Sequence, residues 1–157
     1  RRCAGGGDGV GQGGACKIDS LTGFCLRGIV TIPSIASAAK RAYAQSGLTP
    51  VDIGAGVFYD AFTPIVLWQL ASWGFCDLLD APNFVLDGAL RPDGRLPTNT
   101  HGGQLSEAYI HGVNGIVEAT KLVRGTSVNQ PNKTVNNVLV TSGVGVPTGG
   151  ALLGKLD

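Results

Sequence analysis

The chain has 157 residues, of which 43% are hydrophobic, so it can form one domain with a buried core but is too short for two. Charged residues make up only 15% of the sequence and the formal net charge is +1, which argues against a nucleic-acid-binding surface and against an acidic disordered tail. No apolar run reaches the roughly 18 residues that a membrane span needs, so we expect a soluble, cytoplasmic protein. With so few charges, part of the apolar surface should be covered, which hints at oligomerisation.

The first 28 residues differ from the rest, because they hold nine of the 25 glycines and show no hydrophobic period. We predict a Gly-rich loop or tail over 1–28 and one folded domain over 29–157. Residues 9–14 fit the G-x-G-x-x-G pattern, but no strand precedes them and no helix follows, so no nucleotide site is expected. The four cysteines form no C-x-x-C pair and have no histidine at zinc-finger spacing, which predicts free thiols and no metal site.

Regular structure is predicted from residue 33 onward. A helix should span 33–46, because proline occupies its first turn, alanines fill it and Gly47 can end it. A buried strand is expected over 53–58. It is followed directly by Tyr59 and Asp60, at the carboxyl end where functional side chains collect in α/β proteins.

A second helix should begin at once, with Thr63 as its cap and Gly74 as its stop. The following segment, 81–94, is rich in Pro, Asp, Asn and Gly and should be irregular. A short strand is predicted over 95–99.

The longest helix is expected over 105–124. Its apolar face should consist of Leu105, Tyr109, Gly112, Val113, Ile116, Thr120 and Val123. Two antiparallel strands should close the domain, at 135–141 and 151–156, on either side of a Gly-rich turn. The order of these elements indicates an α/β fold.

Three blocks of sequence are distinctive: residues 57–63 are VFYDAFT, residues 99–112 are NTHGGQLSEAYIHG, and residues 143–145 are GVG. Together they resemble the C-terminal half of the thiolase superfamily, closest to its sterol-carrier or lipid-transfer branch, over about residues 33–156. The resemblance implies a mixed five-stranded sheet with helices on both faces, as one half of an αβαβα sandwich that is usually dimeric. In that superfamily the cysteine that becomes acylated lies in the other half.

The chain departs from this family at three functional positions. Tyr59 and Tyr109 each stand where thiolases of this branch have a histidine, and Thr141 stands where classical thiolases have the first cysteine of Cys-x-Gly-x-Gly. Thiolysis needs an activated thiolate and a base poised near neutral pH. Neither is expected here.

The tyrosine pair is similar to that of lipid-transfer-type aldolases, which shorten steroid side chains carried as CoA thioesters in complex with a small zinc-ribbon and OB-fold protein. This resemblance implies retro-aldol cleavage of a β-hydroxyacyl-CoA by a homodimer, with the CoA thioester as substrate and no cofactor. Tyr59 would take the hydroxyl proton and Tyr109 would protonate the enolate carbon, although the two roles can be exchanged. The expected donors to the thioester oxygen are His101, His111, Asn99 and the backbone N–H groups of Gly143 to Gly145.

Other interpretations stay open at this level. The domain could belong to a thiolase or acyltransferase whose nucleophile comes from the other half, or to a non-catalytic lipid-transfer or scaffold subunit. Asp60 either caps the next helix or tunes Tyr59.

Overall fold

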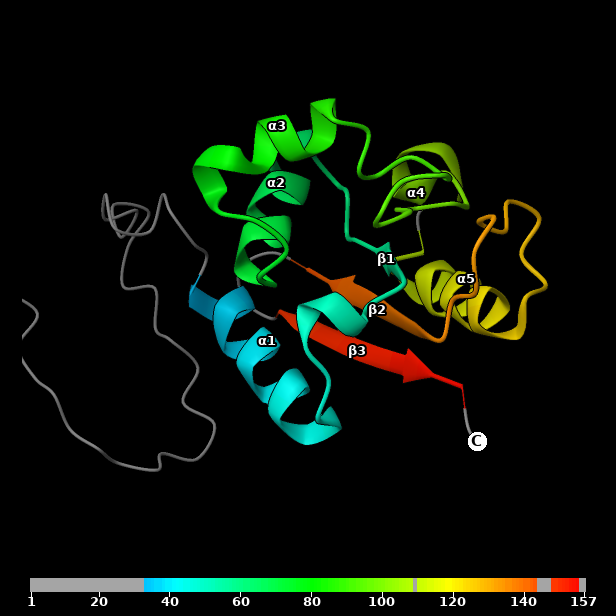
Figure 1. Ribbon diagram of the computed structural model, residues 1–157, viewed down its shortest axis with the longest axis horizontal. Helices are drawn as coiled ribbons and strands as arrows, with labels where there is room; N and C mark the ends of the chain where they lie inside the picture. The colour runs from blue at the N-terminus through cyan, green and yellow to red at the C-terminus, as the bar shows by residue number, and fades with distance from the viewer. Residues whose placement is uncertain (1–32, 109, 144–147, 156–157) are drawn as a thin grey trace, which may run out of the picture.

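The computed structural model describes residues 33–108, 110–143 and 148–155, and these form a mixed sheet with helices on both faces (Figure 1). Its strands are β1 (Ala55–Val57), β2 (Asn137–Ser142) and β3 (Gly149–Gly154), in the order β1-β2-β3. β1 runs parallel to β2, and β3 runs antiparallel to it. The predicted α/β class and mixed sheet are confirmed. The described residues contain three strands of the five that the resemblance implies.

One face of the sheet is covered by α1 (Pro33–Ser46), α2 (Thr63–Ser72) and α3 (Ala81–Leu86), with the short 3-10 helices η2 (Pro50–Asp52) and η3 (Leu78–Asp80). The buried residues of this layer are Ile35, Ala38, Ala39, Ile53, Phe58, Leu70, Trp73, Phe84, Ala89, Leu96 and Leu139. The prediction of α1 is confirmed at both ends, and Gly47 has the left-handed φ of +71° that suits the residue after a helix.

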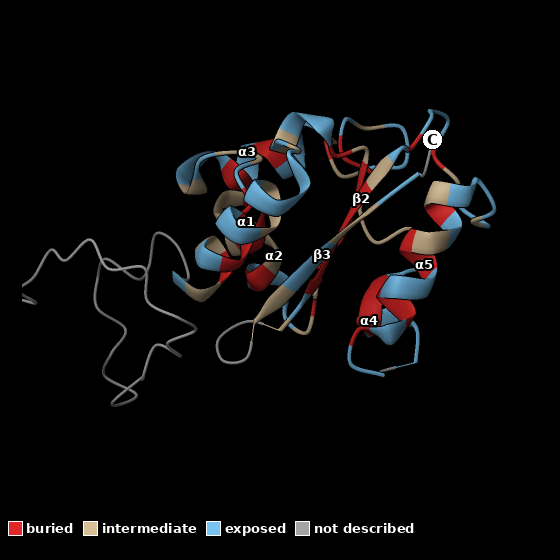
Figure 2. Cartoon of the chain, turned by 90° about the horizontal axis from the view of Figure 1, so that it is seen from below, coloured by how far each residue is buried: buried red, intermediate tan, exposed pale blue. Residues whose placement is uncertain are grey.

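The opposite face is covered by α5 (Val113–Arg124), which packs on β1 and β2. Figure 2 shows α4 (Gly103–Ser106) and α5 on one side of the sheet and α1, α2 and α3 on the other. The buried residues here are Ala55, Val57, Ala119, Leu122, Val135, Val138 and Val140. Alternate residues of β2 therefore serve two separate cores, as a two-sided buried strand must.

Three predictions about local structure were wrong. The segment 81–94 begins with α3 and buries Phe84, whose ring also lies under the Arg95 guanidinium at 3.9 Å. Residues 95–99 make only an isolated bridge, between Thr98 and Gly56. Thr63 does not cap α2, because Phe62 is the N-cap residue and no side chain bonds to the exposed N–H groups.

The helix predicted over 105–124 is two helices, α4 and α5, with a turn between them. His111 and Gly112 have φ of +51° and +93°, and a right-handed helix cannot continue through left-handed residues. Gly112, which is predicted on the apolar face of a single helix, is the N-cap residue of α5. Residue 109 lies outside the described part of the chain.

The apolar face predicted for this helix is largely its exposed face. Of its predicted members, Leu105, Val113 and Ile116 are 63%, 57% and 50% exposed. Asn114 and Glu118, which lie outside the predicted face, are buried. In Figure 2 the side of α5 that faces away from the sheet is mostly pale blue. None of the helices in the described part of the chain has the length and apolarity that a membrane crossing requires.

Candidate functional site

Tyr59 lies two residues beyond the carboxyl end of β1, where the β1–β2 ladder has already ended at the pair Val57 and Val140. The ladder of backbone hydrogen bonds therefore does not reach Tyr59, and side chains bond to its backbone instead. The N–H of Tyr59 donates to Thr141 Oγ1 at 2.8 Å, and Gln69 Nε2 donates to the Tyr59 carbonyl at 2.6 Å. The half-buried Tyr59 is thus fixed at the edge of the sheet by residues from β2 and α2.

Asn99 does the same for Phe58. Its Oδ1 accepts from the Phe58 N–H at 2.7 Å, and its Nδ2 donates to the Phe58 carbonyl and to Asp60 Oδ2, both at 3.1 Å. Asn99 can do this because it adopts a left-handed φ of +49°, which asparagine tolerates better than most residues. Both N–H groups of its amide hold the strand end in this structure. Its role as a donor to substrate stays a prediction.

Asp60 is buried and does not cap α2, contrary to the first alternative above. Its Oδ1 accepts from the backbone N–H of Gln104 at 2.9 Å, so it anchors the start of α4. Gly103 passes so close to this carboxylate that a Cβ at residue 103 would overlap Asp60 Oδ2. The turn 99–103 is therefore pressed against the end of β1.

His101 lies on this turn with its side chain only 7% exposed. Its Nε2 lies 3.7 Å from Glu107 Oε2, and that oxygen also accepts from Asn114 Nδ2 at 2.8 Å. His101 Nδ1 is buried and has no hydrogen-bond partner among the described residues. A buried imidazole with one nitrogen near a carboxylate and the other unpaired is suited to bind a polar group of a ligand.

Glu118, a buried carboxylate of α5, holds the same turn from the other side. Its Oε1 accepts from Thr100 Oγ1 at 2.5 Å and from Ser127 Oγ at 2.6 Å. The Thr100 carbonyl accepts from Asn129 Nδ2 at 2.7 Å. The residue that precedes His101 is therefore bonded through both its side chain and its backbone.

The remaining described candidates lie at the same edge. Gly143, with φ of +73°, directly follows β2. The exposed His111 precedes Gly112, where a Cβ would lie 3.9 Å from Ser142 Cβ at the end of β2. Tyr59, Asn99, His101, His111 and Gly143 are therefore brought together around the carboxyl ends of the two parallel strands. Tyr109 and Gly145 lie outside the described residues, and their roles stay predictions.

The third tyrosine of the chain, Tyr43, is part of the core. Its hydroxyl donates to the Trp73 carbonyl at 3.1 Å, and its ring meets the Trp73 ring edge to face at 5.8 Å. Burial raises the pKa of Tyr43 to about 12, so this phenol ionises less readily than an ordinary tyrosine.

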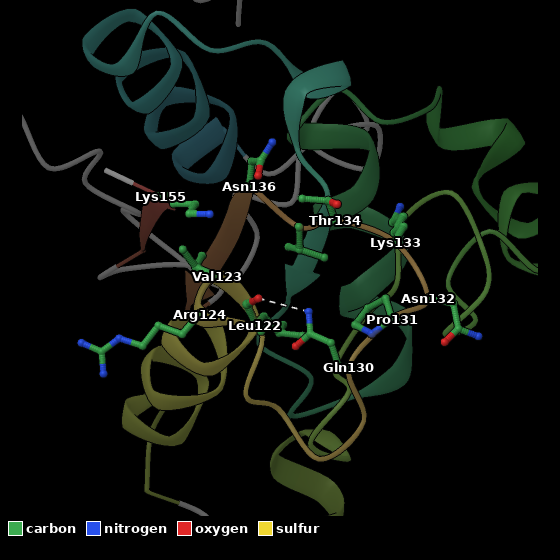
Figure 3. Close-up of a pocket in the computed structure, with 12 residues that line it drawn as sticks. Leu122, Val123, Arg124, Gln130, Pro131, Asn132, Lys133, Thr134, Asn136 and Lys155 are labelled. Atoms are coloured by element: carbon green, nitrogen blue, oxygen red, sulfur yellow. Dashed lines mark hydrogen bonds between the residues drawn. The ribbon is translucent and has the colours of Figure 1, made fainter. Parts of the chain in front are cut away.

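A pocket of about 510 Å³ lies away from the candidate residues, between the C-terminal end of α5 and the segment that leads into β2 (Figure 3). Its lining includes Arg124, Lys133 and Lys155 but none of the predicted site residues. Lys133 Nζ already donates to the Arg95 carbonyl at 2.7 Å, and burial lowers its pKa. The pocket is at the amino end of β2, opposite the edge that holds Tyr59.

Sequence reasoning missed Gln69 as a residue that supports the site, and gave Thr141 no role of its own. Each carries a signal, because Gln69 interrupts the apolar body of α2 and Thr141 ends the apolar run of β2. A buried polar residue needs a partner, so such interruptions mark hydrogen-bond networks. Among the described residues, no group of three His, Cys, Asp or Glu side chains is placed to hold a metal, and Cys76 is a free thiol whose pKa is raised by burial.

Comparison with known proteins identifies the same family that the motifs indicated. Residues 25–152 match the model of the family described as Thiolase C-terminal domain-like. A steroid side-chain-cleaving aldolase of Thermomonospora curvata is 56% identical over 146 residues, which are 93% of this chain and 37% of that protein. A 17-hydroxy-3-oxo-4-pregnene-20-carboxyl-CoA lyase of Mycobacterium tuberculosis is 54% identical over 123 residues, 78% of this chain and 32% of that protein.

A solved structure, described as an Ltp2-ChsH2(DUF35) aldolase, aligns with a TM-score of 0.77 at 61% identity. The alignment covers 79% of this chain and 32% of that one. The chain thus spans about a third of the length of the proteins it matches.

Proposed function

Because this chain belongs to the thiolase C-terminal domain-like family, we propose that it is the part of a carbon–carbon lyase that carries an acid–base tyrosine pair. The reaction is retro-aldol cleavage of a β-hydroxyacyl-CoA, with a steroid side-chain thioester as the substrate class. The observation that carries this proposal is the 56% identity to a steroid side-chain-cleaving aldolase over 93% of the chain.

The chemistry requires a base, an acid and oxyanion donors. A base removes the proton of the β-hydroxyl, the oxygen electron pair forms the ketone, and the bond between the α and β carbons breaks. Its electrons form a thioester enolate, which is protonated at the α carbon to give the shortened acyl-CoA. The net reaction consumes no oxidant, reductant or water, and we propose that it uses no cofactor.

We assign the base to Tyr59 and the acid to Tyr109, or the reverse. The position of Tyr59 at the carboxyl end of a buried parallel strand supports this, because that edge is where α/β proteins place reacting groups. His101 is assigned as a donor to the thioester oxygen, on the grounds of its buried, unpaired Nδ1. His111 and the backbone N–H groups of Gly143 and Gly145 complete the proposed donors.

The decisive test is turnover of 17-hydroxy-3-oxo-4-pregnene-20-carboxyl-CoA, the compound in the name of one relative. The intact protein should release a 17-ketone and a short acyl-CoA without added CoA. Tyr59→Phe should lower kcat by about 10²- to 10⁴-fold, the usual contribution of a general base. Tyr43→Phe is the matched control, because it also removes a phenol but lies in the core. Unchanged turnover by Tyr59→Phe would contradict the assignment of Tyr59. Unchanged turnover by both Tyr59→Phe and Tyr109→Phe would favour a non-catalytic scaffold or a site elsewhere in the protein.

An acyl transferase is the second candidate function. An acetyl-CoA acetyltransferase of Methanothermobacter thermautotrophicus is 30% identical over 97 residues, 62% of this chain and 25% of that protein. Cleavage of a β-ketoacyl-CoA that depends on added CoA would support it. The tyrosines at both histidine positions and the lower identity favour the lyase.

We further propose that the intact enzyme is a homodimer that binds a zinc-ribbon and OB-fold partner protein. The similar solved structure is an Ltp2-ChsH2(DUF35) aldolase, which names two components. The exposed apolar face of α5 offers a surface that such an assembly could cover. Light scattering with and without the partner should give the masses of both assemblies.

A further inference from the structure

Tyr59 is held by a closed ring of hydrogen bonds. Its N–H donates to Thr141 Oγ1 at 2.8 Å, the Thr141 hydroxyl donates to Gln69 Oε1, and Gln69 Nε2 donates to the Tyr59 carbonyl at 2.6 Å. Each of the three N–H or O–H groups in this ring therefore donates to the next residue of the ring. Rotating the Gln69 amide would set its oxygen against the Tyr59 carbonyl, so the ring fixes one orientation of all three groups.

The two supporting side chains are shut off from solvent. Gln69 is 0% exposed and Thr141 is 4% exposed, and Gln69 Nε2 is also tied to the Ile65 carbonyl of its own helix at 3.2 Å. Hydrogen bonds in such surroundings do not exchange with water and restrict the geometry more strongly than exposed ones. Burying an amide and a hydroxyl is unfavourable unless both are satisfied, as they are here.

The ring replaces strand pairing at one residue. The ladder between β1 and β2 ends at Val57, and Phe58 is held by Asn99. The ring supplies partners for both backbone groups of Tyr59 at this half-buried site, where the ladder no longer does so. The ring therefore fixes the Cα–Cβ direction from which the phenol extends.

We propose that Gln69 and Thr141 are positioning residues that set the phenol of Tyr59 for proton transfer. This inference rests on the proposed role of Tyr59. Neither residue touches substrate in this scheme. They act only through the Tyr59 backbone, and a shift of about 1 Å in a reacting group lowers the rate by about 100-fold.

The first test compares Thr141→Val with Thr141→Ser in the intact protein. Valine keeps the shape but removes the hydroxyl, so kcat should fall about 10- to 100-fold while KM changes less than about threefold. Serine keeps the hydroxyl and should restore kcat to within about threefold of wild type. Thr120→Val is the control, because it removes a hydroxyl that donates to the Ile116 carbonyl within α5, away from Tyr59. A normal kcat in Thr141→Val, or an equal loss in Thr141→Ser, would overturn the proposal.

The second test is a double-mutant cycle with Tyr59→Phe. If Thr141 acts through the Tyr59 phenol, adding Thr141→Val to Tyr59→Phe should lower the residual kcat less than twofold, because the group to be positioned is gone. If the loss of kcat in the double variant equals the product of the two single losses, Thr141 acts independently of the Tyr59 phenol. If Tyr59→Phe alone keeps full activity, it is the proposed function that fails, and the two failures are thus distinguished.

Two further measurements cover the case in which Thr141→Val does not fold. Gln69→Met, similar in length, removes the bond to the Tyr59 carbonyl, the acceptor for Thr141 and the longer bond to the Ile65 carbonyl of its own helix. The same kinetic criteria apply. In the wild-type protein, the Tyr59 amide should exchange with solvent as slowly as the β2 amides. Rapid exchange of that amide would refute the ring without any variant.

Discussion

Gly103 packs directly against the carboxylate of Asp60, in a space that leaves no room for a Cβ. This contact brings the N-terminal end of α4 onto the end of β1, where Asp60 Oδ1 accepts from the Gln104 N–H. The turn that carries Asn99 and His101 is thereby fixed beside Tyr59.

Gly103→Ala should destabilise the fold by more than about 3 kcal/mol, because it combines a left-handed φ of +71° with a clash that displaces Asp60. Gly125→Ala is the matched control, since Gly125 has the same φ of +71° and nothing within 4 Å of the added Cβ. The control should lose only about 1 kcal/mol, the cost of a left-handed alanine. Urea unfolding of both variants measures the difference, and equal losses would show that the clash is relieved at no cost.

His101→Gln should lower kcat by about 100-fold with little change in stability, if His101 Nδ1 contacts the thioester oxygen. Glutamine can keep a polar contact with Glu107 but cannot place a donor at the Nδ1 position. Glu107→Gln provides the comparison, because it removes the charge near His101 Nε2 while keeping an acceptor for Asn114. Steady-state kinetics that show a change in KM alone for His101→Gln would place this side chain in ground-state binding.

Glu118→Ala should cost about 3 kcal/mol, because it leaves the half-buried hydroxyls of Thr100 and Ser127 without their shared acceptor. Ser127→Ala removes one of the two donors and should cost about 1 kcal/mol. Urea unfolding measures both losses, because a lower midpoint with an unchanged m-value reports a lower free energy of unfolding. If Glu118→Ala is no worse than Ser127→Ala, the carboxylate does not anchor the turn.

Tyr43→Phe should cost about 1 kcal/mol at pH 8, through the lost bond to the Trp73 carbonyl. The pKa of Tyr43 is about 12 in the folded state against the ordinary value of 10.0. Since the raised value belongs to the folded state, the stabilisation is complete below pH 10 and is lost as pH rises from 10 toward 12. The difference in unfolding free energy between wild type and Tyr43→Phe should therefore shrink as pH rises above 10 toward 12. A constant difference would show that the phenol ionises normally.

Local signals in the sequence predicted much of this fold. Pro33 and Gly47 mark both ends of α1, and the apolar run before Thr141 marks β2, because these features act over a few residues. The break between α4 and α5 was missed, since the apolar spacing continues across His111 and Gly112 although their backbone is left-handed. Periodicity reports the side chains and not the backbone conformation.

The candidate site was predictable only in part. Tyr59 and His101 stand in motifs, and both lie at the predicted edge of the sheet. The ring around Tyr59 joins residues that are 10 and 82 positions away along the chain, so no local pattern contains it. The motif predicts Asn99 as a donor to substrate, whereas its bonds to Phe58 join residues 41 positions apart and become visible only when the strand end is folded.

Helix α5 exposes the apolar Ile116 and Val117 and buries the polar Asn114 and Glu118. This arrangement has a consequence for saturation mutagenesis. In the isolated domain, substitutions at Ile116 and Val117 should be tolerated, whereas conservative changes at Asn114 and Glu118 should be harmful. A tolerance map based on hydropathy alone would rank these four sites in the opposite order. Deep mutational data on this helix would therefore distinguish residues that maintain the domain from residues that serve its associations.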